Sequence, residues 1–157
     1  MRPLSNFDID RYFRRNLYYG GCKSKDLLHL EERKYGNLAN IRKFWIINLD
    51  DSTGEGTHWV MLSFLNPDIG VYFDSFAVDC PQEVLQFMKK HRQRNVMNEN
   101  IIQELDSTNC GYYACYCADE LCKGKLFMDI CSGFSVHEAE NEKRIEEWSE
   151  QAGLGKK

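Results

Sequence analysis

The sequence predicts an α+β fold in which a small, largely antiparallel sheet is packed by helices. Three aromatic and β-branched runs lie in the first half, an apolar segment of helical length follows a polar loop, and a charged helical segment ends the chain. The 157 residues, 43% of them hydrophobic, are enough to bury one core. We therefore expect a single domain over residues 1–157.

The amino-terminal part is predicted to contain two short helices. The first spans residues 5–17, with Asn6 as a candidate N-cap and acidic residues in its first turn. Residues 18–40 are polar and interrupted by glycine, which predicts loops with one short helix near residues 27–32. The apolar residues that share one face of the first helix are Ile9, Tyr12 and Phe13.

Three strands are predicted next, at residues 44–49, 58–65 and 70–76. Turn-forming residues separate them, at 50–54 and at 66–68. The second connection is short, which favours an antiparallel hairpin. The runs are nearly continuous in apolar residues rather than alternating, so we expect both faces of the sheet to be covered.

A helix is predicted from an Asp79 cap, through Pro81 in its first turn, to about residue 93. Its last turn carries the basic run 89–94, which we interpret as a solvated helix end rather than a nucleic-acid site. Residues 100–105 are predicted to form a further short strand. The residues expected to face the core from this helix are Val84, Leu85 and Met88.

Two helices are predicted in the last third of the chain. Residues 110–122 form the most apolar helix candidate and are expected to be central. Ser135 and Glu138 have the spacing of a capping box, which would open a charged helix to about residue 151. Gly153 is expected to end that helix.

Composition excludes several classes of protein. A formal charge of −4 and a pI near 5.6 argue against a protein that coats nucleic acid. No apolar run approaches the roughly 18 residues of a membrane helix, and the amino terminus lacks the apolar core of a secretory signal. Seven cysteines, an odd number, then predict a reduced, non-secreted protein with mostly free thiols.

Four residues in the chain order base, carboxylate, amide and thiol indicate a cysteine-nucleophile hydrolase. His58 begins one predicted strand and Asp74 follows the end of the next, so a hairpin would place them side by side. Cys110 lies where a polar loop meets the start of a helix, and both the helix amino terminus and a neighbouring imidazole favour the reactive thiolate. Asp74 would orient His58.

Gln103 is predicted to donate a hydrogen bond rather than to take part in acid–base chemistry. The tetrahedral intermediate of acyl transfer carries an oxyanion, and the Gln103 amide and the Cys110 backbone N–H are candidate donors to it. Gly111 lacks a side chain just past the nucleophile, which would let a substrate backbone approach. Trp59 is expected in the core on the face opposite His58, or as a shield over the catalytic pair.

These motifs resemble the adenovirus maturation-proteinase family, part of the wider group that contains the SUMO-deconjugating proteases. The resemblance rests on His58-Trp, Asp74 after an aromatic strand, Gln103, and Asn-Cys110-Gly opening an apolar helix. It covers about residues 4–121 and is strongest to proteases encoded by virophages and Polinton-like elements. The segments Leu-Ser-Asn-Phe-Asp-Ile-Asp at 4–10 and Ile-Ile-Asn-Leu-Asp at 46–50 also fit that group.

The resemblance implies that His58 is the base, Asp74 its orienting acid, Gln103 the oxyanion donor and Cys110 the nucleophile. The adenovirus enzyme has glutamate where this chain has Asp74, a mild departure. The resemblance also implies cleavage of capsid or core precursors, often beside glycine, inside the host cell and the virion. The adenovirus enzyme is stimulated by DNA and a viral peptide, but no residues here carry those two activators over. We expect a monomer without a cofactor.

Two other functions remain open. A protease that removes ubiquitin-like modifiers would use the same site, although this chain lacks long insertions for binding a modifier. A non-catalytic protein-binding module could retain the fold, but all four catalytic residue types are present. Papain-type order is excluded, since its histidine follows the cysteine and only His137 does so here. A zinc site is not expected, because Cys115, Cys117 and Cys122 would point in different directions on one helix.

Overall fold

The computed structural model describes residues 1–50 and 58–156. It contains a sheet of five strands in the order β1-β2-β3-β4-β5. The central pairings, β2–β3 and β3–β4, are antiparallel, and the two edge pairings, β1–β2 and β4–β5, are parallel. The strands are β1 (Tyr19–Ser24), β2 (Phe44–Asn48), β3 (Trp59–Ser63), β4 (Ile69–Phe73) and β5 (Arg94–Met97).

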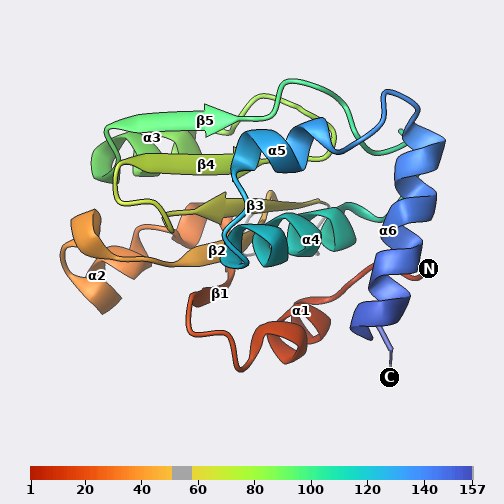
Figure 1. Ribbon diagram of the computed structural model, residues 1–157. Coiled ribbons are helices and arrows are strands. Elements are labelled where there is room, and N and C mark those ends of the chain that lie inside the picture. The colour runs from red at the N-terminus through yellow and green to blue at the C-terminus, as the bar shows by residue number, and fades with distance from the viewer. Residues whose placement is uncertain (51–57, 157) are drawn as a thin grey trace.

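Helices cover both faces of this sheet, which confirms the predicted α+β class (Figure 1). Side chains alternate between two cores: Phe44 and Ile46 join the core beneath α4, whereas Trp45 and Ile47 join the core beneath α3. The first core is built with α1 (Asn6–Phe13), α4 (Cys110–Cys122), α5 (Phe127–Ser132) and α6 (Glu138–Ala152), and the second with α3 (Gln82–His91) and the segment that includes α2 (Leu30–Tyr35).

The N-cap of the first helix lies one residue earlier than predicted, and the helix spans Asn6–Phe13. Ser5, not Asn6, is the N-cap: its hydroxyl accepts a bond from the Asp8 N–H, and the Asp8 carboxylate accepts one from the Ser5 N–H. Arg2 makes two bonds of 2.7 and 2.8 Å to the same carboxylate. This fixes the chain ahead of α1, and the helix ends at Phe13 rather than near residue 17.

The strand predicted at residues 100–105 is wrong. This segment is a loop, and the N–H groups of Ile102 and Gln103 both donate to the Ser75 carbonyl instead of forming a ladder. The fifth strand is Arg94–Met97, which begins at the last residue of the run 89–94 that we had assigned to a solvated helix end. Strand β1 and helix α5 were not predicted; β1 begins Tyr-Gly-Gly, a composition typical of loops.

Two predicted helix caps are also wrong, while one stop signal is confirmed. Helix α3 starts at Gln82 after Pro81, so Asp79 does not cap it. The residue at the α6 cap position is His137, and no capping box forms with Ser135. Gly153 ends α6 in the left-handed conformation, with φ of 72°.

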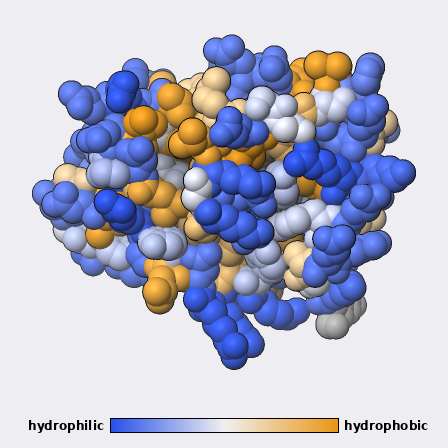
Figure 2. Space-filling model, in the orientation of Figure 1, coloured by the Kyte–Doolittle hydropathy of each residue, from blue (hydrophilic) through white to orange (hydrophobic). Residues whose placement is uncertain are grey.

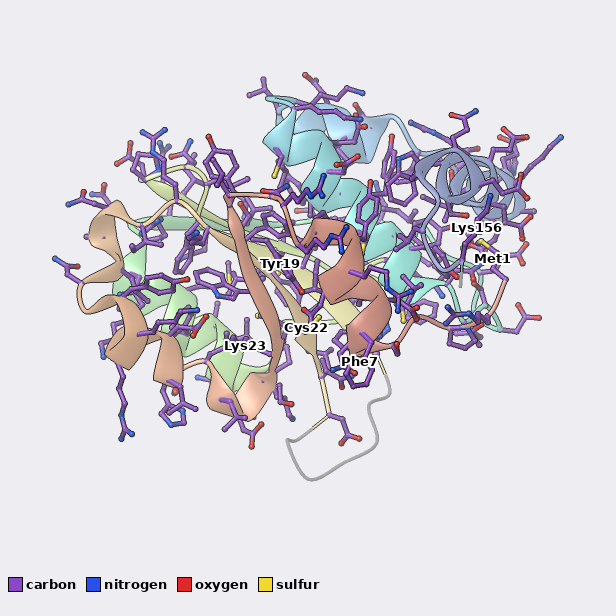
Figure 3. The ribbon with its side chains drawn as sticks, turned by 90° about the horizontal axis from the view of Figure 1, so that it is seen from below. Met1, Phe7, Tyr19, Cys22, Lys23 and Lys156 are labelled. Atoms are coloured by element: carbon purple, nitrogen blue, oxygen red, sulfur yellow. The ribbon has the colours of Figure 1, made fainter. Side chains whose placement is uncertain are left out.

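Figure 3 shows β1 beside α1 at one edge of the sheet. The Tyr19 hydroxyl bonds to Asp10 of α1 at 2.5 Å and lies 3.1 Å from the Cys22 sulfur. Met1 and Lys156 lie near each other beside α6 (Figures 1 and 3). All seven cysteines are free thiols. Within residues 1–50 and 58–156, no helix is long and apolar enough to cross a bilayer.

Apolar side chains are exposed around α5, where Figure 2 shows orange patches among hydrophilic residues. Leu126 and Met128 are 69% and 75% exposed there. They line a groove of about 510 Å³ together with side chains from β4 and β5. None of the residues of this groove also lines the cleft described below.

Candidate active site

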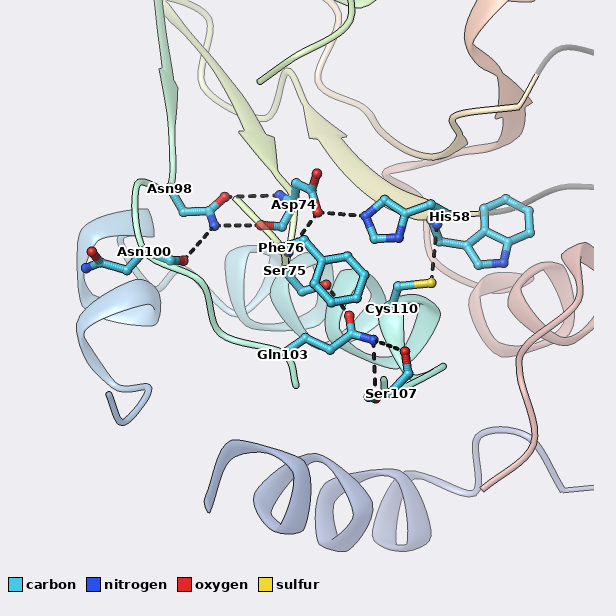
Figure 4. A network of polar contacts seen from close by, with 10 residues as sticks. His58, Asp74, Ser75, Phe76, Asn98, Asn100, Gln103, Ser107 and Cys110 are labelled. Atoms are coloured by element: carbon cyan, nitrogen blue, oxygen red, sulfur yellow. Dashed lines mark hydrogen bonds and ion pairs between the residues drawn. The ribbon is translucent and has the colours of Figure 1, made fainter. Parts of the chain in front are cut away.

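The structure brings His58, Asp74, Gln103 and Cys110 together at one end of the sheet (Figure 4). His58 immediately precedes β3, and Asp74 immediately follows the antiparallel neighbour β4. The predicted turn at 50–54 and the Gly56-Thr57 pair ahead of His58 fall largely within residues 51–57, outside the described residues. Met61 pairs with Phe73 in the antiparallel ladder of β3 and β4, so the end of β4 lies beside the start of β3. This register brings Asp74 to His58.

His58 and Asp74 form a short polar pair. The Nε2 atom of His58 lies 2.6 Å from Oδ1 of Asp74, whose side chain is 1% exposed. The same oxygen accepts a 2.8 Å bond from the Phe76 N–H. The Phe76 ring stacks on the imidazole with centroids 5.1 Å apart, so it holds the ring and limits water on that face.

The other ring nitrogen of His58 lies on the side of the Cys110 sulfur (Figure 4). Burial lowers the pKa of His58, but hydrogen bonds to Asp74 and Cys110 and their charges outweigh it, and the net effect raises the pKa from 6.5 to about 9. The imidazole is therefore held as a cation at neutral pH. A cation beside a thiol favours the thiolate.

Cys110 is the first residue of α4, as predicted. Its sulfur accepts a 3.4 Å bond from the Trp59 backbone N–H, a second interaction that favours negative charge on sulfur. A side chain at Gly111 would come within 3.1–3.2 Å of Leu4 and Trp59. The glycine thus permits packing inside the protein, rather than the substrate approach that we expected.

Trp59 lies next to Cys110, and its partly buried ring packs against the core that includes α4, in line with the predicted core position. Its indole N–H donates to the Leu4 carbonyl at 3.0 Å, which ties the amino-terminal segment to β3. The Tyr112 hydroxyl similarly donates to the Arg2 carbonyl at 2.8 Å. The resulting cleft has a volume of about 280 Å³ and is lined by Pro3, Leu4, His58, Trp59, Phe76, Ser107, Thr108 and Cys110.

Gln103 is fully buried beside Cys110 and is bonded at both ends of its amide. Its Oε1 accepts a 2.6 Å bond from the Ser75 hydroxyl. Its Nε2 donates to the carbonyl of Ser107 at 2.9 Å and approaches the Ser107 hydroxyl at 3.2 Å. The amide plane is thereby fixed, with its N–H groups on the side of the α4 amino terminus.

Asn98 is a supporting residue that sequence reasoning missed. It follows β5, is buried, and makes two bonds to the backbone of Asp74: its Oδ1 accepts from the N–H at 3.0 Å, and its Nδ2 donates to the carbonyl at 2.6 Å. No local pattern marks it, because it lies 24 residues from its partner. Ser75 and Ser107 were also missed.

The turn after Asp74 has an unusual backbone. Ala77 has φ of +53°, and its N–H donates to the Asp74 carbonyl at 2.8 Å. A left-handed conformation in a residue other than glycine costs free energy, and such residues often lie at functional sites. The tight turn 74–77 directs the side chains of Asp74, Ser75 and Phe76 apart: Asp74 and Phe76 contact His58, and Ser75 contacts Gln103.

Helix α6 supports the loop that carries Gln103 and Cys110. The Asn141 amide donates to the Ile102 carbonyl at 3.0 Å, next to Gln103. The Glu142 carboxylate accepts a 3.3 Å bond from Asn109, which precedes the cysteine, and a second bond from the Tyr113 hydroxyl. The charged terminal helix, for which we predicted no role at the site, thus holds both segments in place.

Within the described ranges, no cluster of three or more His, Cys, Asp or Glu side chains could hold a metal ion. The buried Cys115 and Cys117 belong to the core under α4. The contacts at the site instead form two arms, one for acid–base chemistry from His58 and Asp74, and one for hydrogen-bond donation from Gln103 and the start of α4. Such an arrangement suits nucleophilic attack by Cys110 on a carbonyl.

No protein-family model matches the chain, and no curated protein matches its sequence. Its fold is similar to two crystal structures of the ASFV pS273R protease, with TM-scores of 0.61 and 0.60 and identities of 17% and 16%; each match covers 91% of this chain and 66% of that chain. A structure of AvrA delL154 with IP6 and CoA matches with a TM-score of 0.50 and 16% identity, over 73% of this chain and 47% of that chain. The present chain thus spans just under two thirds of the ASFV protease, with which it shares its α+β fold.

Proposed function

We propose that the chain is a cysteine endopeptidase with Cys110 as its nucleophile. The observation that carries this proposal is the placement of His58 between Asp74 and Cys110, with the Nε2–Oδ1 distance at 2.6 Å. The order of the three groups matches a nucleophile, a base and an orienting acid. The fold shared with the ASFV pS273R protease supports the same conclusion.

In this proposal the Cys110 proton resides on His58, and the Cys110 thiolate attacks the carbonyl carbon of the scissile peptide bond. The carbonyl oxygen becomes an oxyanion, which accepts bonds from the Gln103 amide and the Cys110 N–H. Protonated His58 gives its proton to the leaving amine as the carbon–nitrogen bond breaks. A water molecule, deprotonated by His58, then hydrolyses the Cys110 thioester and restores the free thiol.

We further propose that the substrates are precursors of viral capsid or core proteins. This part rests on the resemblance of the His58-Trp59 and Asn109-Cys110-Gly111 motifs to viral maturation proteases. The enzyme would then act as a monomer inside the host cell and in the virion. A deconjugating protease would use the same catalytic groups on a different substrate, so substrate choice is what the experiment must resolve.

The test incubates the chain with a capsid precursor, a proteome-derived peptide library and a panel of ubiquitin-like fusion proteins. New amino termini are identified by mass spectrometry. We expect cleavage of the precursor and of peptides by the wild type, and a loss of at least about 10³-fold in Cys110→Ala. Cys131→Ala, which removes a half-buried thiol on α5, is the matched control and should retain full activity.

Cleavage by Cys110→Ala at the wild-type rate would rule out the proposed nucleophile. Cleavage confined to the ubiquitin-like fusions would assign the deconjugating function instead. If no substrate were cut although Cys110 reacted normally with small electrophiles, the binding-module alternative would be favoured.

A further inference from the structure

Ser75 follows the proposed acid directly, yet the chemistry described above gives it no part. Its side chain is buried, and the residue is 1% exposed. The hydroxyl is directed away from Asp74 to the other arm of the site, where it meets Gln103 (Figure 4). This buried hydroxyl thus connects the two arms of the site.

Ser75 contacts Gln103 at two places. Its hydroxyl donates to Oε1 of the Gln103 side chain at 2.6 Å. Its carbonyl accepts the backbone N–H groups of Ile102 and Gln103 at 2.9 and 3.1 Å. One residue therefore fixes both the backbone position of Gln103 and the far end of its side chain.

The orientation of the amide follows from its two neighbours taken together. The Ser107 carbonyl can only accept a hydrogen bond, so the Nε2 end of Gln103 must face it, at 2.9 Å. The hydroxyl of Ser75 must then donate to the remaining end, Oε1. Without that hydroxyl, Oε1 would be a buried acceptor without a donor, which costs free energy. The side-chain amide would then rotate to a position in which Oε1 accepts a hydrogen bond.

We propose that Ser75 is a positioning residue that holds the Gln103 amide with its Nε2 end toward Ser107 and the start of α4, the side from which that end would reach the oxyanion. The inference rests on the proposed function, because it assumes that Gln103 stabilises an oxyanion. Since Ser75 follows Asp74 in the tight turn 74–77, the acid and the oxyanion donor are positioned by a single turn. A shift in this turn would disturb both arms together.

Two reagents separate oxyanion stabilisation from thiolate reactivity. With p-nitrophenyl acetate, the Cys110 sulfur bonds to the acetyl carbon through a tetrahedral oxyanion, and p-nitrophenolate leaves. With iodoacetamide, the same sulfur displaces iodide and no oxyanion forms. The ratio of the two rate constants at Cys110, followed by mass spectrometry after quenching, therefore reports on the oxyanion site alone, and normal alkylation also shows that the variant is folded.

We expect Gln103→Ala to lower this ratio by about 10²-fold, as for the loss of one oxyanion donor. Ser75→Ala should lower it by about 10-fold, because the amide remains but is misplaced. In the Gln103→Ala background, Ser75→Ala should change the ratio by less than about twofold, since nothing is left to position. The matched control is Ser63→Ala on β3, which removes a buried hydroxyl that accepts a bond from the Leu65 N–H. It should not alter the ratio.

A ratio unchanged in Ser75→Ala would overturn the inference, and so would an equal decrease with and without Gln103. A ratio unchanged in Gln103→Ala would also overturn it, because the amide would then not be a donor. The proposed function is judged separately by peptide cleavage. Cleavage with a ratio insensitive to Ser75 would reject only the inference, and a sensitive ratio without any peptide cleavage would reject only the endopeptidase.

Discussion

The charge on His58 depends on neighbours that act in opposite directions. Burial disfavours the imidazolium, whereas hydrogen bonds to Asp74 and Cys110 favour it, and the balance raises the pKa to about 9. In the unfolded chain the pKa returns to about 6.5. Folding therefore binds a proton more tightly at this position, which links stability to pH.

The stabilisation from protonated His58 should be fully present below about pH 6.5 and lost as the pH rises through about 9. We expect the free energy of unfolding to fall over this range by up to about 3 kcal/mol in the wild type. Asp74→Asn removes the charge that favours the imidazolium, so its stability should fall less. Urea unfolding followed by tryptophan fluorescence at pH 6.5, 8 and 9.5 measures both, and parallel curves for the two proteins would contradict the assignment.

Helix α3 ends in a contact that joins distant segments. Arg92 follows the helix and is 3% exposed, although we had interpreted the run 89–94 as solvated. Its guanidinium stacks on the Phe64 ring at 4.2 Å and donates only to backbone carbonyls. The carbonyls belong to Leu38, Ala39, Ile41, Phe64, Asn66 and His91. His91 also deviates from the prediction, since its side chain is only 10% exposed, whereas Lys90 is 62% exposed; both pair with Glu32.

Replacement of Arg92 by methionine should therefore destabilise the protein strongly. It leaves several buried carbonyls without donors, and we expect a loss of about 3 kcal/mol or more in the free energy of unfolding. Arg94→Met, which alters an exposed arginine two residues on, should change stability by less than about 0.5 kcal/mol. Chemical denaturation gives both values. A loss below about 1 kcal/mol for Arg92→Met would show that the carbonyls find water instead.

Elements whose signals are local were predictable from the sequence. The hairpin of β3 and β4 followed from its turn residues, and its register put His58 beside Asp74. The helix that begins at Cys110 followed from its apolar run. Strand β5 could not be predicted, because three of its four residues are exposed and it pairs in parallel with β4. Its sequence therefore shows neither an alternation of apolar and polar residues nor a hairpin turn.

Across the whole molecule, the missed parts of the site are those made by contacts between distant segments. Asn98 holds Asp74 from 24 residues away, and Ser75 meets Gln103 across 28. Glu142 of α6 supports Asn109 across 33 residues. Such pairs depend on how helices and loops pack over the sheet, which a hydrophobic pattern does not specify. The sequence could thus predict the four candidate site residues that the fold brings together, but not the residues that hold them.

The seven thiols should differ sharply in reactivity. Burial raises the pKa of Cys22 and Cys80 to about 12 and that of Cys131 to about 11, and raises the pKa of Cys115, Cys117 and Cys122 as well. Cys110 instead faces a protonated imidazole. A low dose of iodoacetamide at pH 7.5 should modify Cys110 at least about tenfold faster than any other thiol, as measured by peptide mass spectrometry.

The control is His58→Ala, which should abolish this preference without exposing the buried thiols. Equal labelling of all seven cysteines in the wild type would contradict both the pKa pattern and the assigned nucleophile. Preferential labelling of Cys22 or Cys80 would locate the reactive thiol elsewhere.

The anchoring of residues 2–4 has a practical consequence for handling the protein. Leu4 is tied to Trp59 and lines the cleft, and Met1 lies near Lys156 beside α6. An affinity tag or a fluorescent fusion partner at either of these residues would therefore emerge on the same side, near the cleft that would receive a polypeptide in the proposed function. For assays, the protein is better labelled on the opposite flank, at exposed positions of α2 (Figure 1).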